Sequence, residues 1–342
     1  MDVVTTLHEA YQEGRRQTKS DPVENALRSW LEEQSSYLRS RLAPRELAIF
    51  VRCKSECTKA EKSVVLHGDV QSACRFLATA QIVSERSDLS HEARLRCRTE
   101  LAAAESHVDD CCHDFEHAKE KALESMALDE ELEDRFGYRL THVHRIHLLN
   151  RLVTLEARSG RLPEAMRFAA TIFRYLEGTC QTIPLPGSWG HLHLMHLSPG
   201  ILKFLTRQLA GEIAGVLLRE ENNVVLEALK MILQGRSVSA TPDAWDPVAL
   251  AWFDLKILTL QADKTLSYLK ACTEFLAKGP GSATLLWHLT ALDAAMICKS
   301  LRPHQGGIFA RAVLTDLLTM DNFPLSLRIQ WVKFLNSKKE VS

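Results

Sequence analysis

The chain has 342 residues, of which 46% are hydrophobic and 25% are charged, so it can bury a sizeable core without disulfide or metal staples. The formal net charge of −1 excludes a nucleic-acid binder that relies on a globally basic surface. Glycine (15) and proline (11) are scarce, which favours helices over a turn-rich β architecture.

Cysteine usage and hydropathy indicate the compartment. Nine cysteines, an odd number without a CxxC pair, predict free thiols in a reducing environment. The opening residues, MDVVTTLHEAYQEGRR, lack the apolar run of a secretory signal. The most apolar stretches, 201–218 and 283–298, are interrupted by charged residues, which disfavours a membrane span. We therefore expect an intracellular, cytoplasmic protein, with a nuclear location as the alternative and no membrane association.

Helix signals recur from the N-terminus onward. Asp21-Pro22 combines an N-cap with a proline at the first helical position, and Pro44 and Gly68-Asp69 begin two further helices. Ser90 caps a long helix that we expect to continue to about Arg135, over residues 90–135. Its apolar residues recur at spacings of three and four, like the seam of a coiled coil. They are Cys97, Leu101, Ala104, Val108, Cys111, Phe115, Ala118 and Ala122.

The outer face of this predicted long helix is strongly acidic. Thirteen Asp and Glu residues lie between Glu100 and Asp134, against two lysines. A solvated surface explains such a face, and a docking strip for a basic segment of a partner protein is the alternative. On the second interpretation Glu116, Glu120 and Glu124 contact the partner.

The rest of the chain alternates helices with two irregular stretches. Further helices are expected at about 139–158, 162–177, 199–220, 224–233, 247–262, 264–278, 282–301, 306–320 and 324–337. Ile183-Pro184 and Leu185-Pro186 cannot continue a helix, so 180–198 is predicted to be an irregular loop. Residues 236–246 form a second linker. The predicted regions are therefore 1–136, 137–235 and 236–342, all helical, because no segment alternates with period two.

Residues 149–176, LNRLVTLEARSGRLPEAMRFAATIFRYL, resemble one unit of the tetratricopeptide repeat family. The matching positions are Leu149 and Leu152 in the first helix, Gly160 in the turn, and Ala165, Phe168 and Ala169 in the second helix. Residues 57–81 carry part of the same pattern. The resemblance implies antiparallel helix pairs stacked as an irregular TPR-like α-solenoid. The period of about 34 residues is not sustained, and the consensus tryptophan and closing proline are absent.

Residues 144–190 are also similar to the C-terminal helical region of MYND-type SET methyltransferases, which is itself tetratricopeptide-like. The catalytic Asn-His motif of that family is absent here. The resemblance therefore implies a helical fold and no enzymatic activity or catalytic residue.

Six histidines fall into two groups, His142, His144 and His147, and His191, His193 and His196. Imidazole is a preferred zinc ligand, so a meeting of the two groups would create a metal site, with His144 and His193 as its candidate ligands. On a helix, however, only the pair 144/147 shares a face. Ordinary roles in caps, at the surface or in the core are the alternative, which we favour.

The pentapeptide 113–117 matches the H-x-x-E-H pattern of zinc peptidases. On a helix His113 and His117 would share one face, with Glu116 as general base. Phe115 belongs to the apolar seam, which places both histidines outward and leaves the site without a sheltered cleft. The pattern is short, and we favour a chance match.

Two tryptophans in predicted linkers, Trp189 and Trp245, are candidate interface anchors, because tryptophan dominates many binding hot spots. Trp252 and Trp287 fall on apolar helix faces and are expected in the core. The chain contains no P-loop and no G-x-G-x-x-G, and we predict no cofactor, no enzymatic activity and no nucleic-acid binding. The sequence favours a non-enzymatic scaffold or adaptor that binds another protein. A metal-dependent hydrolase and a structural subunit of a larger complex are the alternatives.

Overall fold

The computed structural model describes residues 2–17, 21–217, 220, 222–234, 245–261, 264–281 and 283–320. Over these residues the chain forms fifteen α-helices and no strand, which confirms the predicted all-α fold. They are α1 (Val3–Arg15), α2 (Pro22–Arg41), α3 (Pro44–His67), α4 (Val70–Ser84), α5 (His91–Cys111), α6 (Phe115–Phe136), α7 (Thr141–Arg158), α8 (Leu162–Leu176), α9 (His191–Leu194), α10 (Pro199–Leu217), α11 (Asn222–Gln234), α12 (Pro247–Thr259), α13 (Thr265–Ala277), α14 (Thr284–Leu301) and α15 (Pro303–Thr319).

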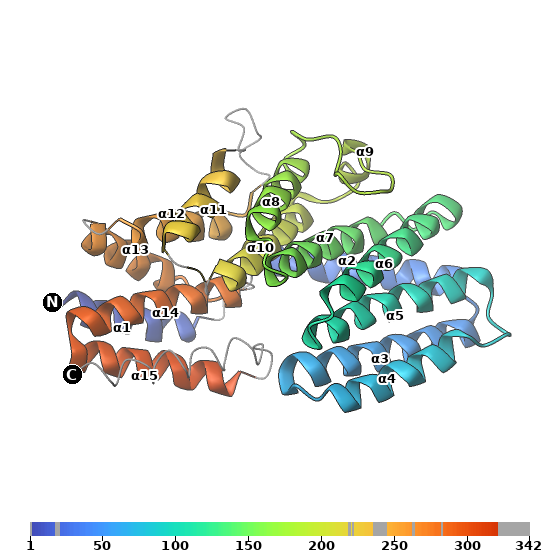
Figure 1. The fold of residues 1–342 in the computed structure, drawn as a ribbon, viewed down its shortest axis with the longest axis horizontal. Coiled ribbons are helices and arrows are strands. Elements are labelled where there is room, and N and C mark those ends of the chain that lie inside the picture. Colours follow the sequence, from blue (N-terminus) through green and yellow to red (C-terminus); the bar gives the residue numbers. More distant parts are fainter. Residues whose placement is uncertain are drawn as a thin grey trace.

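The helices form two groups on either side of α10 (Figure 1). In the first group α3 packs on α4, α5 on α6 and α7 on α8, and these pairs contact one another through α3 with α5 and α6 with α7. In the second group α12, α13, α14 and α15 pack in succession, and α1 joins them. α10 contacts α2, α7, α8, α12 and α14, so it connects the two groups.

The described part of the chain leaves several predictions open. The predicted helix 324–337 and most of the predicted linker 236–246 lie outside the described residues. The division into regions 1–136, 137–235 and 236–342 stays a prediction. Among the described helices, none combines the length and apolar character that a transmembrane span requires.

The predicted long helix over residues 90–135 is wrong, because α5 ends at Cys111 and α6 begins at Phe115. The chain reverses at His113, whose φ of 64° lies in the left-handed region. Asp114 then caps α6, since its Oδ1 accepts the backbone N–H of His117 at 3.2 Å. The apolar seam therefore closes α5 against α6 as a hairpin.

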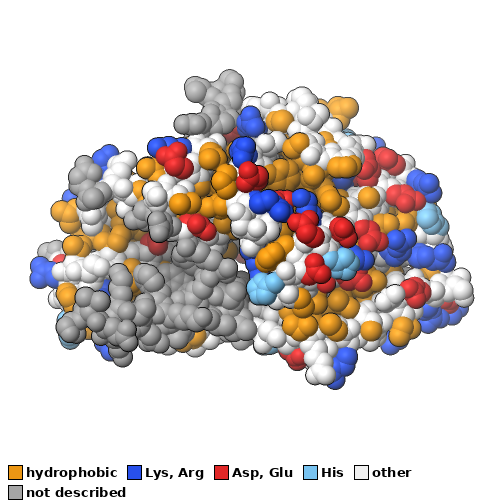
Figure 2. Space-filling model, viewed as in Figure 1, with side chains coloured by type: hydrophobic (Ala, Val, Ile, Leu, Met, Phe, Trp, Pro, Cys, Tyr) orange, Lys and Arg blue, Asp and Glu red, His pale blue; other side chains and the backbone are white. Residues whose placement is uncertain are grey.

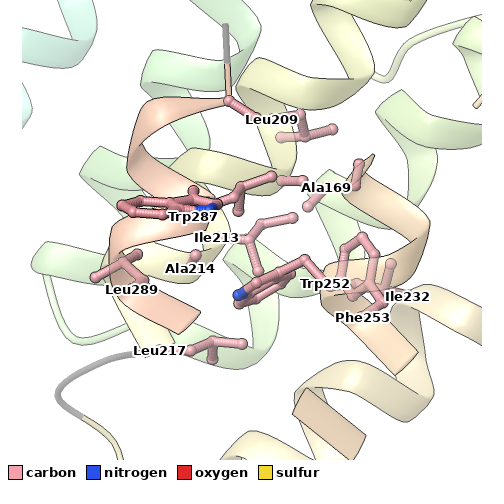
Figure 3. Packing of buried hydrophobic residues seen from close by; sticks show 14 of the residues in the cluster. Ala169, Leu209, Ile213, Ala214, Leu217, Ile232, Trp252, Phe253, Trp287 and Leu289 are labelled. Atoms are coloured by element: carbon pink, nitrogen blue, oxygen red, sulfur yellow. The ribbon is translucent and has the colours of Figure 1, made fainter. Parts of the chain in front are cut away.

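The core of the described residues consists of a large cluster around α10, a smaller one between α2 and α6, and a third between α3, α4 and α5. In the large cluster Ile213 of α10 lies between Trp287 on one side and Trp252 and Phe253 on the other (Figure 3). Trp252 is 3% exposed and Trp287 is 1% exposed, which confirms the prediction that both belong to the core.

α1 packs against helices from the other end of the chain. The ring of Tyr11 stacks on Trp287 with centroids 4.8 Å apart, and its hydroxyl donates to Asp316 Oδ2 at 2.5 Å. Gln17 Nε2 donates to the carbonyl of Ala277 at 2.9 Å. The first helix is therefore held by α13, α14 and α15.

A buried arginine on α10 joins the N-termini of two other helices. Arg207 forms a bidentate pair with Asp246, at 2.6 and 3.0 Å, and a further bond to Asp21 Oδ2 at 2.5 Å. Each aspartate is also an N-cap, Asp21 of α2 and Asp246 of α12. Asp21 and Asp246 therefore accept hydrogen bonds from the first N–H groups of their own helices and also position α10 through Arg207.

The unit 149–176 forms the expected helix pair, α7 and α8, with Gly160 in the turn. Gly160 has a φ of 85°, which only glycine adopts without strain, and Ala165 is fully buried. The pairing of these helices is confirmed, and membership of the repeat family stays a prediction.

Substitution of Gly160 tests the turn. A Cβ at this position meets no atom within 4 Å, so any loss of stability reports backbone strain alone. We expect Gly160→Ala to lower the free energy of unfolding by about 1 kcal/mol in urea denaturation. Gly215, two residues before the end of α10, also has open space around a Cβ, and there Gly215→Ala should raise stability by roughly 0.5 kcal/mol. Equal effects of the two variants would contradict the left-handed turn.

Substitution of Arg207 tests the junction of α2, α10 and α12. Arg207→Met leaves the buried Asp246 carboxylate and the part-buried Asp21 carboxylate without their shared cation, and we expect a loss of about 3–5 kcal/mol by denaturant unfolding. Arg167→Met is the control, because the Arg167–Glu164 pair is exposed and should contribute less than about 1 kcal/mol. A loss no greater than that of the control would show that Arg207 does not hold the three helices together.

Candidate functional site

The 180–198 segment between α8 and α10 is irregular, as predicted, apart from the short helix α9. Three of its apolar side chains, Ile183, Leu194 and Leu197, enter the large core cluster with exposures of 4%, 3% and 7%. A segment that buries its own side chains in the core has a defined position on the body of the protein. It lies near α7 and α8 in the upper right of Figure 1.

Polar contacts fasten the middle of this segment to α6 and α7. The backbone N–H of Ser188 donates to Glu130 on α6. Gly187 has a φ of 112°, and a Cβ there would come within 2.7 Å of Glu130 Oε2 and 2.9 Å of Arg145 Nη2. Only glycine therefore fits at this position. Trp189 adds a cation–π contact, because the Arg145 guanidinium lies 4.3 Å from its ring centroid.

The same segment exposes two large apolar side chains. Leu192 is 75% exposed and Met195 is 67% exposed, within three residues of each other. Isolated exposed apolar residues are ordinary, and these two differ in that the segment carrying them is held to the body by buried contacts. The sequence predicts the irregular 180–198 segment but does not identify Leu192 and Met195 as exposed. A helix of four residues is too short for its sequence pattern to show which side chains are buried.

Beneath the segment the structure brings together Glu133, His142 and His193, which we name the Glu133–His142–His193 cluster. One ligand atom from each residue lies within 4.8 Å of the other two. His142 Nδ1 is 3.7 Å from Glu133 Oε1, and His193 Nδ1 is 3.9 Å from Glu133 Oε2. The two imidazole rings stack with centroids 4.8 Å apart. This is the one group of three potential metal ligands among the described residues.

The contacts of His142 are compatible with either neutral tautomer. Its Nε2 lies 2.9 Å from the Tyr175 hydroxyl, and that hydroxyl lies 3.2 Å from the carbonyl and 3.4 Å from the N–H of Gly190. If the hydroxyl donates to the carbonyl, it accepts from Nε2 and leaves a lone pair on Nδ1. Nδ1 is buried without a hydrogen-bond partner and faces Glu133.

Burial favours the neutral forms of His142 and Tyr175. His142 is 1% exposed, and burial lowers the pKa of its imidazole, although the Glu133 carboxylate opposes the shift. Burial also raises the pKa of Tyr175 to about 12, so its hydroxyl stays protonated. Neutral imidazole is the form that binds metal ions.

The predicted pairing of His144 with His193 is wrong. His144 Nδ1 lies 2.6 Å from Asp129 Oδ2 on α6, and this buried carboxylate holds the histidine away from the 180–198 segment. His142, two residues earlier, points to His193 instead. Burial alone would lower the pKa of His144, but Asp129 raises it overall.

The helical zinc-peptidase geometry considered for residues 113–117, against which we favoured a chance match, does not occur in the structure. His113 lies in the left-handed turn between α5 and α6 and His117 in the first turn of α6, so they do not share a helix face. His117 Nδ1 instead pairs with Asp109 Oδ2 at 2.9 Å. The pattern is part of a helix-capping turn.

The two tryptophans proposed as interface anchors differ in position. Trp245 is only 3% exposed and stacks on Phe173 with ring centroids 4.2 Å apart, and its indole N–H donates to Glu177. Its burial corrects the expectation of a surface anchor. Trp189 is half-buried and holds the 180–198 segment on Arg145, so its larger contribution is to position that segment.

The acidic strip predicted on residues 100–134 is only partly a surface. Asp110 and Asp129 are buried and face arginine or histidine side chains of α5 and α7. Glu124 pairs with Arg98 and Lys121. Glu116 and Glu120 are exposed, and Glu116 pairs with Arg161. Figure 2 shows acidic and basic side chains intermixed over this half of the molecule. A basic partner for this strip stays a prediction.

Comparison with known proteins identifies no matching family model, no matching curated protein and no matching solved structure. The tetratricopeptide and methyltransferase resemblances therefore stay predictions.

A second polar region lies between α3, α5 and α7. Burial and the nearby Glu100 carboxylate raise the pKa of Glu61 to about 7, although His144 and Arg151 act in the opposite direction. A glutamate in the unfolded chain has a pKa near 4.3. The folded chain therefore holds this proton more tightly, and the contribution of Glu61 to stability falls as pH rises through this interval.

The raised pKa of Glu61 predicts that Glu61→Gln and the parent chain differ in how their stability depends on pH. We expect Glu61→Gln to match the parent chain at pH 4.5 and to be more stable at pH 8, by about 1 kcal/mol because partial exposure screens the charge. Urea unfolding at the two pH values measures it. Glu32→Gln is the control, because Glu32 is exposed on α2, and this variant should not become more stable than the parent chain at pH 8. A pH-independent effect of Glu61→Gln would contradict the raised pKa.

Proposed function

We propose that this chain is a non-enzymatic protein-interaction module, and that its 180–198 segment docks an apolar surface of a partner protein. The observation that carries the proposal is the exposure of Leu192 and Met195, 75% and 67%, on a segment held to the body by buried contacts. Their burial in a complex would remove apolar surface from water without first ordering a loop.

The helical architecture supports the same proposal. The pairs α3/α4, α5/α6 and α7/α8 pack side by side, as degenerate repeats of the tetratricopeptide type would. Such arrays commonly present their helix faces and inserted loops to peptides or partner helices. The 180–198 segment is the long insertion that follows the third pair.

We further propose that the protein works in a reducing, intracellular compartment. All nine cysteines are free thiols, and five of them, including Cys53 and Cys97, are buried. Buried free thiols act as small apolar side chains and need no oxidising environment.

A surface double variant tests the docking segment. Leu192→Ser with Met195→Ser removes apolar surface from exposed positions, so the melting temperature should be unchanged while partner binding falls by at least about tenfold. Binding is measured by quantitative affinity capture from the native source with the full chain as bait, followed by titration of the purified partner.

Ile82→Ser provides the matched control, because Ile82 is 72% exposed on α4, away from the segment. This variant should retain the partner. Equal retention of the partner by the double variant, or equal loss in the control, would contradict docking at the 180–198 segment.

A further inference from the structure

We infer that Glu133, His142 and His193 form a binding site for a divalent transition-metal ion, with Zn²⁺ as the best match. Two imidazole nitrogens and one carboxylate are a common three-ligand set for zinc, with water in a fourth position. The ligands come from the end of α6, the start of α7 and the 180–198 segment. The site joins three parts of the chain that no other described ligand group connects.

The separations suit an ion of this size. Tetrahedral ligands at 2.0–2.2 Å from zinc lie about 3.3–3.6 Å apart. The Glu133–His142 and Glu133–His193 pairs lie at 3.7 and 3.9 Å, each to a different carboxylate oxygen, and all three ligand atoms lie within 4.8 Å of one another, so metal binding requires the side chains to close in by up to about 1 Å. His193 is the ligand with freedom to adjust, because its side chain is 34% exposed, whereas Glu133 is 7% exposed.

His142 supplies the observation that points to a ligand. Its Nδ1 is buried without a hydrogen-bond partner, which is costly for an isolated imidazole. The Tyr175 hydroxyl can accept the Nε2 proton, and in that tautomer the lone pair of Nδ1 is available to a metal ion beside Glu133. Metal-binding histidines are oriented in the same way, by donation of the other ring N–H to an oxygen.

The neighbouring charges favour a cation. Arg145 Nη1 donates to Glu133 Oε2 at 2.9 Å and brings one positive charge to the site. Glu130 also lies near Arg145, since the positions around Gly187 place both side chains together. Two carboxylates therefore face one guanidinium, and the surplus negative charge suits a divalent ion. Glu133 Oε1 accepts from Thr141 Oγ1 at 3.1 Å, which orients the carboxylate.

Metal binding would fasten the 180–198 segment to α6 and α7 through His193. The effect is structural, because zinc that binds the folded chain stabilises it by mass action. It does not depend on a docked partner, so it can be tested on the isolated chain.

The test uses the purified full-length chain without an affinity tag. Elemental analysis after equilibration with Zn²⁺ and removal of free metal should give one zinc per chain, and Zn²⁺ should raise the melting temperature and slow proteolysis within residues 180–198. His193→Ala should weaken zinc binding by at least about tenfold and abolish both effects. His196→Ala is the control, since His196 is exposed three residues further on, and it should behave like the parent chain.

A second ligand variant and a Co²⁺ spectrum distinguish loss of the zinc site from misfolding and from binding to cysteine. Glu133→Gln keeps the shape of the side chain and should also lose zinc, which covers the case in which one variant folds poorly. Co²⁺ in place of Zn²⁺ should give ligand-field absorption without a thiolate charge-transfer band, because the ligands are nitrogen and oxygen. Absence of zinc from the parent chain, retention of zinc by both variants, or a thiolate band from the free cysteines would overturn the assignment.

Discussion

The packing of both helical groups depends on one buried guanidinium. Arg207 is 6% exposed, and a charge in that position is tolerable only with carboxylate partners. Both partners, Asp21 and Asp246, are also helix N-caps, so the beginnings of α2 and α12 are fixed relative to α10 by the groups that satisfy their own backbone. The apolar side chains of α10 provide most of the buried area, and the ion pairs determine the relative position of the helices that bury it.

Features that depend on neighbouring residues were predictable from the sequence. Asp21-Pro22, Ser90 and Gly160 mark helix ends, because an N-cap, a first-turn proline or a left-handed glycine acts within one turn. The prediction of one long helix was wrong because an apolar spacing of three and four fits a continuous helix and a hairpin of two helices equally well. Asp114 and the left-handed His113 decide between them, and a non-glycine residue in that conformation has no sequence signature.

The candidate site was predictable only in part. His193 and the proximity of the two histidine groups follow from composition, but the partner is His142, because Asp129 on α6 holds His144 elsewhere. Glu133 was missed, although Gly137 between α6 and α7 turns the chain so that 133 and 142 come together. The prediction that Trp245 lies at the surface was wrong because its stacking on Phe173 joins residues far apart in the sequence. Long-range contacts of this kind leave no local pattern.

The position of α1 bears on how the protein is made. Tyr11 is synthesised 305 residues before Asp316, to which its hydroxyl donates. At typical elongation rates this interval lasts roughly 15–60 s. Throughout that time the apolar face of α1, with Val4, Leu7 and Tyr11, has no native surface to cover it. The nascent chain is therefore expected to need a chaperone, or a transient contact, for α1 until α13, α14 and α15 have been made.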